Sequence, residues 1–250
     1  MNQLPIVLYP PFFVPKKVGE NIWIVDGDTV DMNFKLFTVP FSTRMTIIKL
    51  ENSDLWVHSP VHLTKELKKE IDKLGKVRYL VAPNKLHYSF IEEWCQFYEE
   101  ANVLVAKGLD KKITRKSAIK NITHLEDSVL PAWLKEIDCI TFKGSFYVEE
   151  LVFFHQKSKT LIVTDLIENI ETRNVSLFQK FLFKIGDNTY PAGRTPRDLR
   201  FTFFFQKHLA RQSYQKMKNW RPHNLILAHG RCFFGNAMDH LRQAFFWLEK

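Results

Sequence analysis

The chain has 250 residues, of which 45% are hydrophobic and 22 are phenylalanine. This much apolar surface offsets the entropy lost on ordering the chain, so intrinsic disorder is excluded. The formal net charge of +9 favours anionic partners, but the excess lies in short groups that alternate with apolar residues, at 65–73, 107–120 and 207–221. That spacing is typical of solvated helix faces, and no finger-like Cys/His spacing occurs, so nucleic-acid binding is a minor hypothesis.

The cysteines and the first residues indicate the cellular compartment. Cys95, Cys139 and Cys232 are far apart and form no CxxC motif, which argues against a disulfide scaffold or a zinc knuckle. The first apolar stretch is broken by prolines and lacks the basic start and small-residue cleavage site of a secretory signal. No run reaches the ~18 apolar residues of a membrane span. We therefore predict a protein of the reducing cytoplasm.

In the first half of the chain, strands alternate with helices. Thr64 is expected to cap a helix, because its hydroxyl can accept from the amide three residues on while an apolar stripe repeats at helical spacing. The apolar run that ends at Pro83 is typical of a buried parallel strand. The expected elements are a strand from Glu20 that ends at the turn 26–28, strands at 43–50 and 55–60, a helix at 64–75, a strand at 77–83, a helix at 89–100 and a strand at 101–107.

The second half continues the alternation and contains no linker rich in Gly or Ser. We therefore predict one domain over residues 1–250, with an α/β architecture of two half-sheets, each flanked by helices. The aromatic groups at Phe201–Phe205 and Phe245–Trp247 are interpreted as core. The expected elements are strands at 136–144, 147–156 and 159–167, helices at 178–185 and 201–220, a strand at 224–230 and a helix at 237–248.

Polar side chains follow four of the predicted strands. Ligands usually bind where the carboxyl ends of such strands converge, because backbone groups are free there. Imidazole and carboxylate groups at the ends of apolar strands also suit a zinc or non-haem iron site. The residues in question are His58, Asn84 with His87, Asp165 and His229.

These stretches resemble a known family. RMTIIKLENSDLWVHSP, VRYLVAPNKLHYSFIEEW, EELVFFHQKSKTLIVTDLIEN and LILAHG are similar to an uncharacterised branch of the metallo-β-lactamase superfamily, catalogued as a domain of unknown function. The resemblance runs over most of the chain. It implies an α/β (α+β) fold, the four-layer αββα sandwich of the metallo-β-lactamase type, with a metal site between its two sheets.

The resemblance also assigns roles to single positions. Asp165 falls where the superfamily has its metal-bridging aspartate, and His229 falls where it has its last metal-binding histidine. His58 replaces an aspartate that usually supports the site by hydrogen bonds. The HxHxDH signature is reduced to PNKLHY, in which Asn84 and His87 are the only ligand candidates.

A second departure concerns the middle histidine of the superfamily. Gly144 or Ser145 lies near its expected position, and neither offers an imidazole. The resemblance therefore implies at most a mononuclear site of His87, Asp165 and His229, which His58 could join, or an empty site.

Each of these candidate residues could also have a purely structural role. A histidine after a strand often only bonds a backbone carbonyl, and Asp165 can cap the turn that follows its strand. Arg194, Arg197 and Arg200 could grip a carboxylate or phosphate, or belong to a solvated loop.

Two functions follow from the sequence. In the first, His87, Asp165 and His229 bind one zinc or iron ion, His58 or Asn84 orients water or substrate, and a small ester, amide, thioester or phosphate is hydrolysed. Its substrate would be a small molecule, and the basic charge suggests an anionic one. In the second, the fold and pocket persist without catalysis or metal, as a ligand-binding or partner-binding module.

Overall fold

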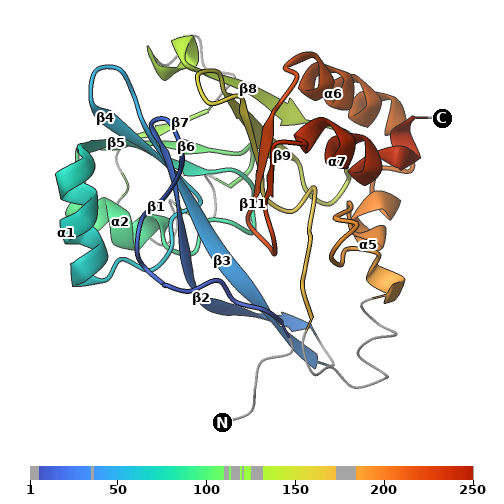
Figure 1. Ribbon diagram of the computed structural model, residues 1–250, viewed down its shortest axis with the longest axis horizontal. Helices are drawn as coiled ribbons and strands as arrows, with labels where there is room; N and C mark the ends of the chain where they lie inside the picture. Colours follow the sequence, from blue (N-terminus) through green and yellow to red (C-terminus); the bar gives the residue numbers. More distant parts are fainter. Residues whose placement is uncertain are drawn as a thin grey trace.

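The computed structural model contains two β-sheets that pack against each other, with helices on both outer sides (Figure 1). It describes residues 6–34, 37–109, 113, 119, 121–124, 132–172 and 184–249, and for 32–34 and 37–40 only the backbone. One sheet has seven strands in the order β1 to β7, and the other has five in the order β12-β11-β10-β9-β8.

The seven-stranded sheet begins as an antiparallel meander from β1 to β4 and continues with β5, β6 and β7, which run parallel to β4. The parallel strands need crossovers, and helices α1 and α2 provide two of them. The elements are β1 (Lys16–Gly19), β2 (Ile22–Phe34), β3 (Phe37–Lys49), β4 (Asp54–His58), α1 (Lys65–Leu74), β5 (Lys76–Ala82), α2 (Ile91–Phe97), β6 (Asn102–Val105) and β7 (Ile122–Thr123).

The five-stranded sheet is antiparallel except between β10 and β11, which pair in parallel. Helices α6 and α7 lie over its outer face (Figure 1). The elements are η1 (Ala132–Lys135), β8 (Ile137–Phe142), β9 (Glu150–His155), β10 (Thr160–Val163), α5 (Arg197–Phe201), α6 (Lys207–Asn219), β11 (Asn224–Leu227), β12 (Phe233–Phe234), α7 (Ala237–Ala244) and η2 (Phe246–Leu248).

Three apolar clusters separate the four layers. One lies between the seven-stranded sheet and helices α1 and α2, and includes Leu67, Ile71 and Trp94. A second lies between the five-stranded sheet and helices α5 to α7. The third, which includes Trp56 and Phe153, lies between the two sheets. This arrangement is the predicted αββα sandwich.

The α1 helix forms as its sequence predicts. The Thr64 hydroxyl accepts a hydrogen bond from the amide of Leu67 at 3.1 Å, and the amide of Gly75 donates to the carbonyl of Ile71. Glu66 in the first turn and Lys73 in the last turn complement the helix dipole.

Several expected elements differ in the structure. The strand from Glu20 does not end at the turn 26–28, because β2 absorbs these residues in a bulge and continues to Phe34. The long helix expected at 201–220 is confirmed only over α6, because residues 202–206 form turns and Phe201 is the last residue of α5. The helix at 89–100 is confirmed only over α2, and the final helix ends as η2. Most of the helix expected at 178–185 lies outside the described residues.

The interpretation of the aromatic groups as core is wrong in part. Phe203 and Phe245 are fully buried, but Phe201, Phe204 and Phe205 are 70%, 72% and 79% exposed. They lie at the end of α5 and in the turns after it, where the expected helix is interrupted, so their side chains do not follow one helical stripe.

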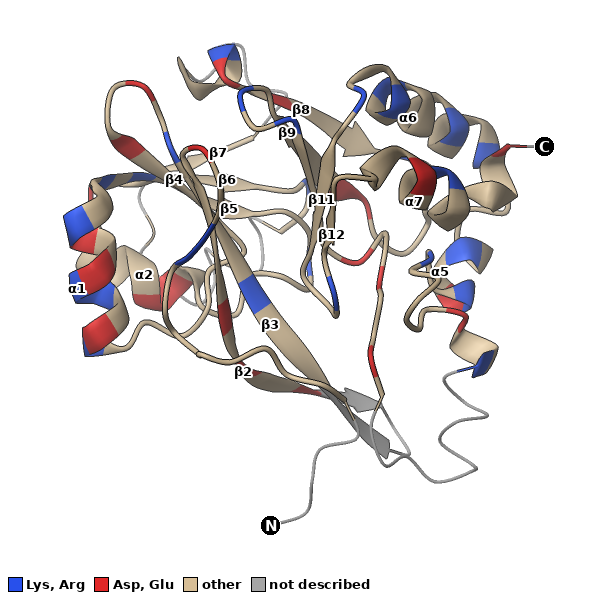
Figure 2. Ribbon diagram, in the orientation of Figure 1, with Lys and Arg blue, Asp and Glu red and all other residues tan. Residues whose placement is uncertain are grey.

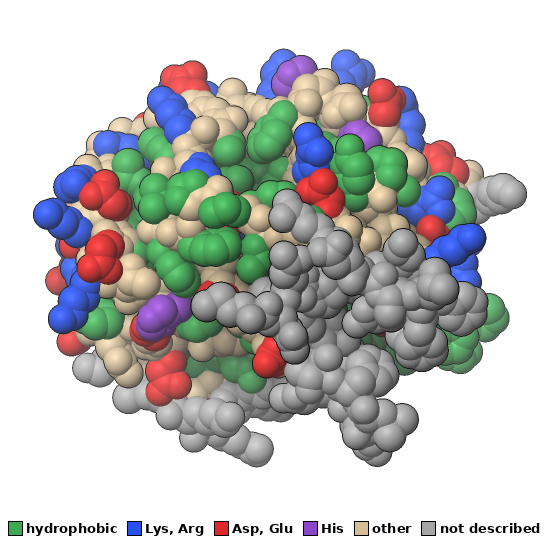
Figure 3. All heavy atoms as spheres, turned by 60° about the horizontal axis from the view of Figure 1, so that its bottom comes forward, with side chains coloured by type: hydrophobic (Ala, Val, Ile, Leu, Met, Phe, Trp, Pro, Cys, Tyr) green, Lys and Arg blue, Asp and Glu red, His purple; other side chains and the backbone are tan. Residues whose placement is uncertain are grey.

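Charged side chains lie mainly on the outer helices. Lysine and arginine alternate with acidic residues along α1, whereas α6 carries only basic charges (Figure 2). On the face shown in Figure 3, hydrophobic side chains gather toward the middle and charged ones at the edge where α1 lies. Within the described part of the chain, no helix is long and apolar enough to cross a membrane.

Candidate metal centre

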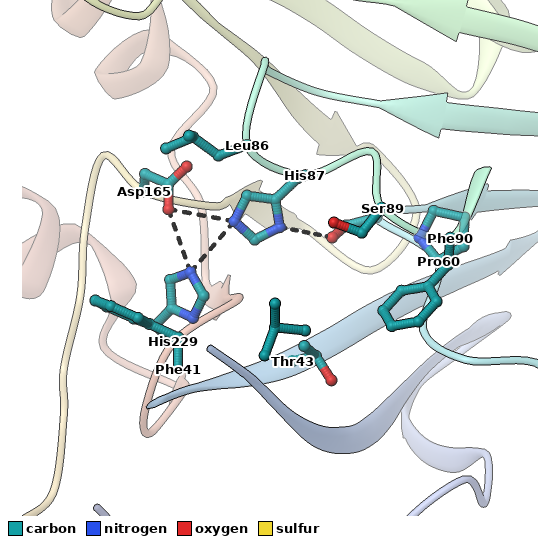
Figure 4. Close-up of a pocket in the computed structure, with 11 residues that line it drawn as sticks. Phe41, Thr43, Pro60, Leu86, His87, Ser89, Phe90, Asp165 and His229 are labelled. Carbon is teal, nitrogen blue, oxygen red and sulfur yellow. Dashed lines mark hydrogen bonds and ion pairs between the residues drawn. The ribbon is translucent and has the colours of Figure 1, made fainter. Parts of the chain in front are cut away.

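Three of the predicted site residues meet where strands of both sheets end. His87 follows β5 of the seven-stranded sheet, whereas Asp165 and His229 follow β10 and β11 of the other sheet. Figure 4 shows both imidazole rings turned toward the Asp165 carboxylate. The His87 Nε2 atom lies 3.2 Å from His229 Nε2 and 3.2 Å from Asp165 Oδ1, and His229 Nε2 lies 3.2 Å from the same oxygen. Among the described residues, these form the one cluster with metal-ligand spacing.

The orientation of His229 is set by the seven-stranded sheet. Its Nδ1 atom donates to the carbonyl of Ser42 on β3 at 2.8 Å, which leaves the lone pair of Nε2 directed at the other two residues in the neutral ring. The buried Arg44 guanidinium holds the same loop, since it donates to the carbonyls of Leu227 and Gly230 at 2.7 Å each. Arg44 is paired with Asp26.

His87 is held by two neighbours from its own sheet. Its Nδ1 atom forms a 2.8 Å hydrogen bond with the hydroxyl of Ser59, which directly follows β4. Its backbone amide donates to Asn84 Oδ1, as does the amide of Leu86. These bonds fix the turn after β5 and leave Nε2 facing the cluster.

Asp165 is oriented by side chains beneath it. Asn84 Nδ2 donates to Asp165 Oδ2 at 2.6 Å, so the other oxygen faces the histidines. Glu150, at the start of β9, accepts the amides of Thr164 and Asp165 at 2.7 and 2.9 Å. Glu150 was not predicted as a site residue, although it is an acidic residue at the start of an otherwise apolar strand.

Two predicted positions lie differently from the expectation. Asn84 is fully buried, donates to Asp165 and accepts the amide of His87, so it supports these two residues instead of facing the pocket. His58 lies between the sheets, stacked on Trp56 at 5.6 Å and edge-on to Phe153. Its Nε2 atom has no hydrogen-bond partner among the described residues. Ser145 bonds to Thr202 beside α5.

Comparison with known proteins identifies the family. A model of the family described as "Domain of unknown function (DUF4336)" matches residues 20–198. The chain belongs to this family. No curated protein sequence matches it.

Solved structures similar to this DUF4336 protein include two metallo-β-lactamases. The DIM-1 enzyme exposed to ceftazidime has a TM-score of 0.59 at 14% identity, over 93% of this chain and 95% of that one. The metallo-β-lactamase from Pontibacter korlensis has a TM-score of 0.59 at 12% identity, over 95% and 99%. The metal-soaked Flv1 flavodiiron core from Synechocystis sp. PCC6803 has a TM-score of 0.64 at 10% identity, over 94% and 60%. At these identities the likeness establishes the fold alone, which is the predicted fold of the metallo-β-lactamase type.

Negative charge surrounds the two imidazoles of the DUF4336 protein. Burial alone would lower the pKa of His87, but Asp165 and Glu150 outweigh it, and the pKa lies above its usual value. Burial also opposes charge on Asp165, yet His87 and His229 hold its pKa below the ordinary range. Burial and the charge of Asp165 raise the pKa of Glu150. A cation at the cluster would balance this charge.

The donor set of the DUF4336 protein fits one metal ion. With bonds of about 2.0–2.1 Å, the ligand atoms of a tetrahedral zinc ion lie about 3.3 Å apart, and those of an octahedral ion about 3.0 Å. The observed separations of 3.2 Å lie between these values. Because the Nδ1 proton of His229 is directed at the Ser42 carbonyl, Nε2 can offer its lone pair to an ion that Asp165 Oδ1 also binds.

The cluster opens into a small pocket of about 70 Å³. Figure 4 shows Phe41, Pro60 and Phe90 among its walls. The described residues that line it include no lysine or arginine.

Proposed function

We propose that this protein is a metal-dependent hydrolase with a reduced, mononuclear site, in which His87, Asp165 and His229 bind one zinc or iron ion. The observation that carries the proposal is the triangle of three ligand atoms with sides of 3.2 Å. When bound, the ion supplies a Lewis acid that lowers the pKa of a water molecule and polarises a carbonyl or phosphoryl oxygen.

The protein's own groups fix the ligands before any ion binds. Ser42 sets the tautomer of His229, Ser59 fixes the ring of His87, and Asn84 holds the outer oxygen of Asp165. Such supporting partners commonly change metal affinity by 10–100-fold. We therefore assign Asn84 a positioning role and assign His58 no role at the reacting atoms, because the described pocket lining does not include it.

The pocket supports a narrower choice of substrate. Its described walls are mostly apolar and carry no cationic side chain that could pair with a phosphate or carboxylate. Esters, amides and thioesters therefore fit better than phosphates, and the anionic substrate expected from net charge is not favoured. The apolar walls would exclude bulk water from the acyl group.

Metal content tests this proposal directly. Protein purified without chelator or metal-affinity tag is analysed by plasma mass spectrometry, together with Asp165→Ala, His229→Ala and the control His208→Ala, whose imidazole is exposed on α6. We expect about one equivalent of zinc or iron in wild type and in the control, and a loss of at least tenfold in the two site variants.

Folding of each variant is checked by circular dichroism, so that loss of metal is separated from loss of structure. Wild-type protein that contains no metal and takes up neither added Zn²⁺ nor Fe²⁺ would overturn the proposal. The alternative of a binding module without an ion would then remain. If the ion is present, an ester and thioester screen of wild type against Asp165→Ala follows.

A further inference from the structure

Four phenylalanine side chains that do not belong to the candidate metal centre form an exposed cluster. We name it the aromatic patch, and it consists of Phe146, Phe201, Phe204 and Phe205. They are 64%, 70%, 72% and 79% exposed. The ring centroid of Phe146 lies 6.5 Å from that of Phe201 and 6.4 Å from that of Phe205, which lies 5.4 Å from Phe204. Soluble monomers seldom expose contiguous apolar surface of this kind without a function.

The aromatic patch is fixed by the surrounding backbone. The loop between β8 and β9 packs on the turns between α5 and α6, where the amide of Phe146 donates to the carbonyl of Thr202 at 3.2 Å. The hydroxyls of Ser145 and Thr202 are 2.6 Å apart. At Gly144, φ is +107° and a Cβ would lie 2.6 Å from the carbonyl oxygen of Gln206. The rings therefore project from a close-packed junction.

A basic helix follows the patch directly. Helix α6 has the sequence KHLARQSYQKMKN, with four lysine or arginine residues and no acidic residue (Figure 2). One of the four, Lys218, is paired with Glu249, which leaves a net positive helix. Its buried face consists of Ala210, Ser213, Tyr214 and Met217, so it is amphipathic. On the other side of the patch, exposed Arg197 and Asp198 balance each other. The surface thus combines protruding apolar rings with a net positive helix.

We propose that the aromatic patch and α6 together bind an anionic lipid surface. Apolar rings that project from a basic amphipathic element can enter the boundary between headgroups and acyl chains, while lysine and arginine attract the negative leaflet. The protein would lie on the membrane as a peripheral protein. This inference is independent of the metal centre.

Two other partners fit the surface less well. In a two-fold dimer, α6 would face its own copy, and its cations would repel each other. With about 200 Å² for each phenylalanine, the exposed part of the patch is roughly 570 Å², below the ~800 Å² that each partner buries in a typical stable interface. Single-stranded nucleic acid needs open ring faces for stacking, whereas Phe146 with Phe201 and Phe204 with Phe205 contact each other edge to face.

Vesicle flotation tests the proposal with the full chain. Vesicles of phosphatidylcholine alone are compared with vesicles that also contain phosphatidylglycerol. We expect wild type to float with the anionic vesicles, less so as salt is raised. Phe204→Ser/Phe205→Ser and Lys207→Glu/Lys216→Glu should each lower the bound fraction at least about tenfold.

The matched control is Phe97→Ser, because Phe97 is 54% exposed on α2 in the opposite outer layer and should float like wild type. Thermal melting checks that each variant is folded. The proposal is overturned if wild type does not float with anionic vesicles, or if the Phe204→Ser/Phe205→Ser variant floats equally well. If wild type does not float but binds a labelled single-stranded RNA, and the substitutions abolish that binding, the surface would be assigned to RNA instead. If wild type does not float but forms a dimer that the substitutions dissociate, the surface would be assigned to the dimer.

Discussion

The amide of Asn84 connects the two sheets at the candidate metal centre. Its oxygen accepts the backbone amides of Leu86 and His87, and its nitrogen donates to Asp165 and Thr164. The donor side of this amide therefore faces a carboxylate, with Glu150 3.3 Å away.

Asn84→Asp should weaken metal binding with little change in side-chain volume. The new carboxylate keeps the two backbone acceptor contacts but replaces the donor beside Asp165 with a like charge, which displaces the ligand oxygen. We expect the Kd for Zn²⁺ to rise about 10–100-fold in competition with a chromogenic chelator. Asn219→Asp, at the exposed end of α6, is the control. A Kd equal to that of wild type would show that Asn84 does not position the ligand.

Sequence patterns identified the three candidate metal ligands better than the residues that orient them. His87, Asp165 and His229 follow apolar strands, and the ends of such strands meet at one edge, so their proximity could be predicted. Glu150 stands out only as an acidic residue at the start of an apolar strand, and the structure is needed to place its carboxylate beside the amides of Thr164 and Asp165. The position of His58 follows from strand periodicity, since Trp56 and His58 share one face of β4, toward the inner core.

At the scale of elements, the loop after β11 depends on one close backbone contact. Gly230 has φ +87°, and a Cβ there would lie 2.0 Å from the carbonyl oxygen of Asn169. The two segments pair through a parallel bridge next to His229 of the candidate metal centre. The backbone of Asn169 therefore fixes where His229 stands.

Gly230→Ala should destabilise the protein more than Gly235→Ala. Both glycines have positive φ, but a Cβ at Gly235 (φ +91°) meets no atom within 4 Å. In urea, the free energy of unfolding of Gly235→Ala should be about 1–2 kcal/mol lower than that of wild type, because alanine is strained in the left-handed conformation. For Gly230→Ala we expect at least about 3 kcal/mol, because the backbone must also shift. Equal losses would mean that the close contact relaxes without cost.

The order of strands and helices could be predicted largely from periodicity, but their ends could not. The Asp-Gly-Asp sequence in β2 resembles a turn, but it forms a bulge. The bulge accommodates the extra residues without ending the pairing with β3, so the strand continues. The interruption between α5 and α6 follows from tertiary contacts with the β8–β9 loop, which no local pattern records. Arg194 and Arg200, considered as anion ligands, both pair with Asp187.

At the scale of the whole molecule, two buried histidines make stability depend on pH. Burial, with the charge of His87 as a smaller cause, lowers the pKa of His58 to about 3. Burial also lowers the pKa of His155 to about 4. In the unfolded chain both would titrate near 6.5.

Stability should therefore fall as the pH is lowered from 6.5 toward 4. In this window the unfolded chain binds more protons than the folded one, so the free energy of unfolding rises with pH, by up to about 1.4 kcal/mol per unit for each histidine. His58→Phe keeps the ring contacts with Trp56 and Phe153 and should roughly halve the slope that the two histidines contribute. An unchanged slope in urea titrations would contradict the pKa assigned to His58.

The same titrations bear on domain organisation. We propose that residues 1–250 form one domain, since the inner core draws on both sheets. Coincident unfolding curves by tryptophan fluorescence and circular dichroism would support one cooperative unit, and separated curves would contradict it. The absence of a Gly/Ser linker suggested this from the sequence, but only the shared core gives the physical reason.

The ligands of the candidate metal centre come from different layers of the sandwich. His87 belongs to one sheet and Asp165 and His229 to the other, while the Ser42 carbonyl reaches across to His229. A bound ion would therefore act as a cross-link, and its binding free energy would oppose every fluctuation that parts the two sheets. Amide hydrogens on β5 and β10 would then exchange with solvent more slowly in the ion-bound protein, even though these strands lie in separate hydrogen-bonded ladders.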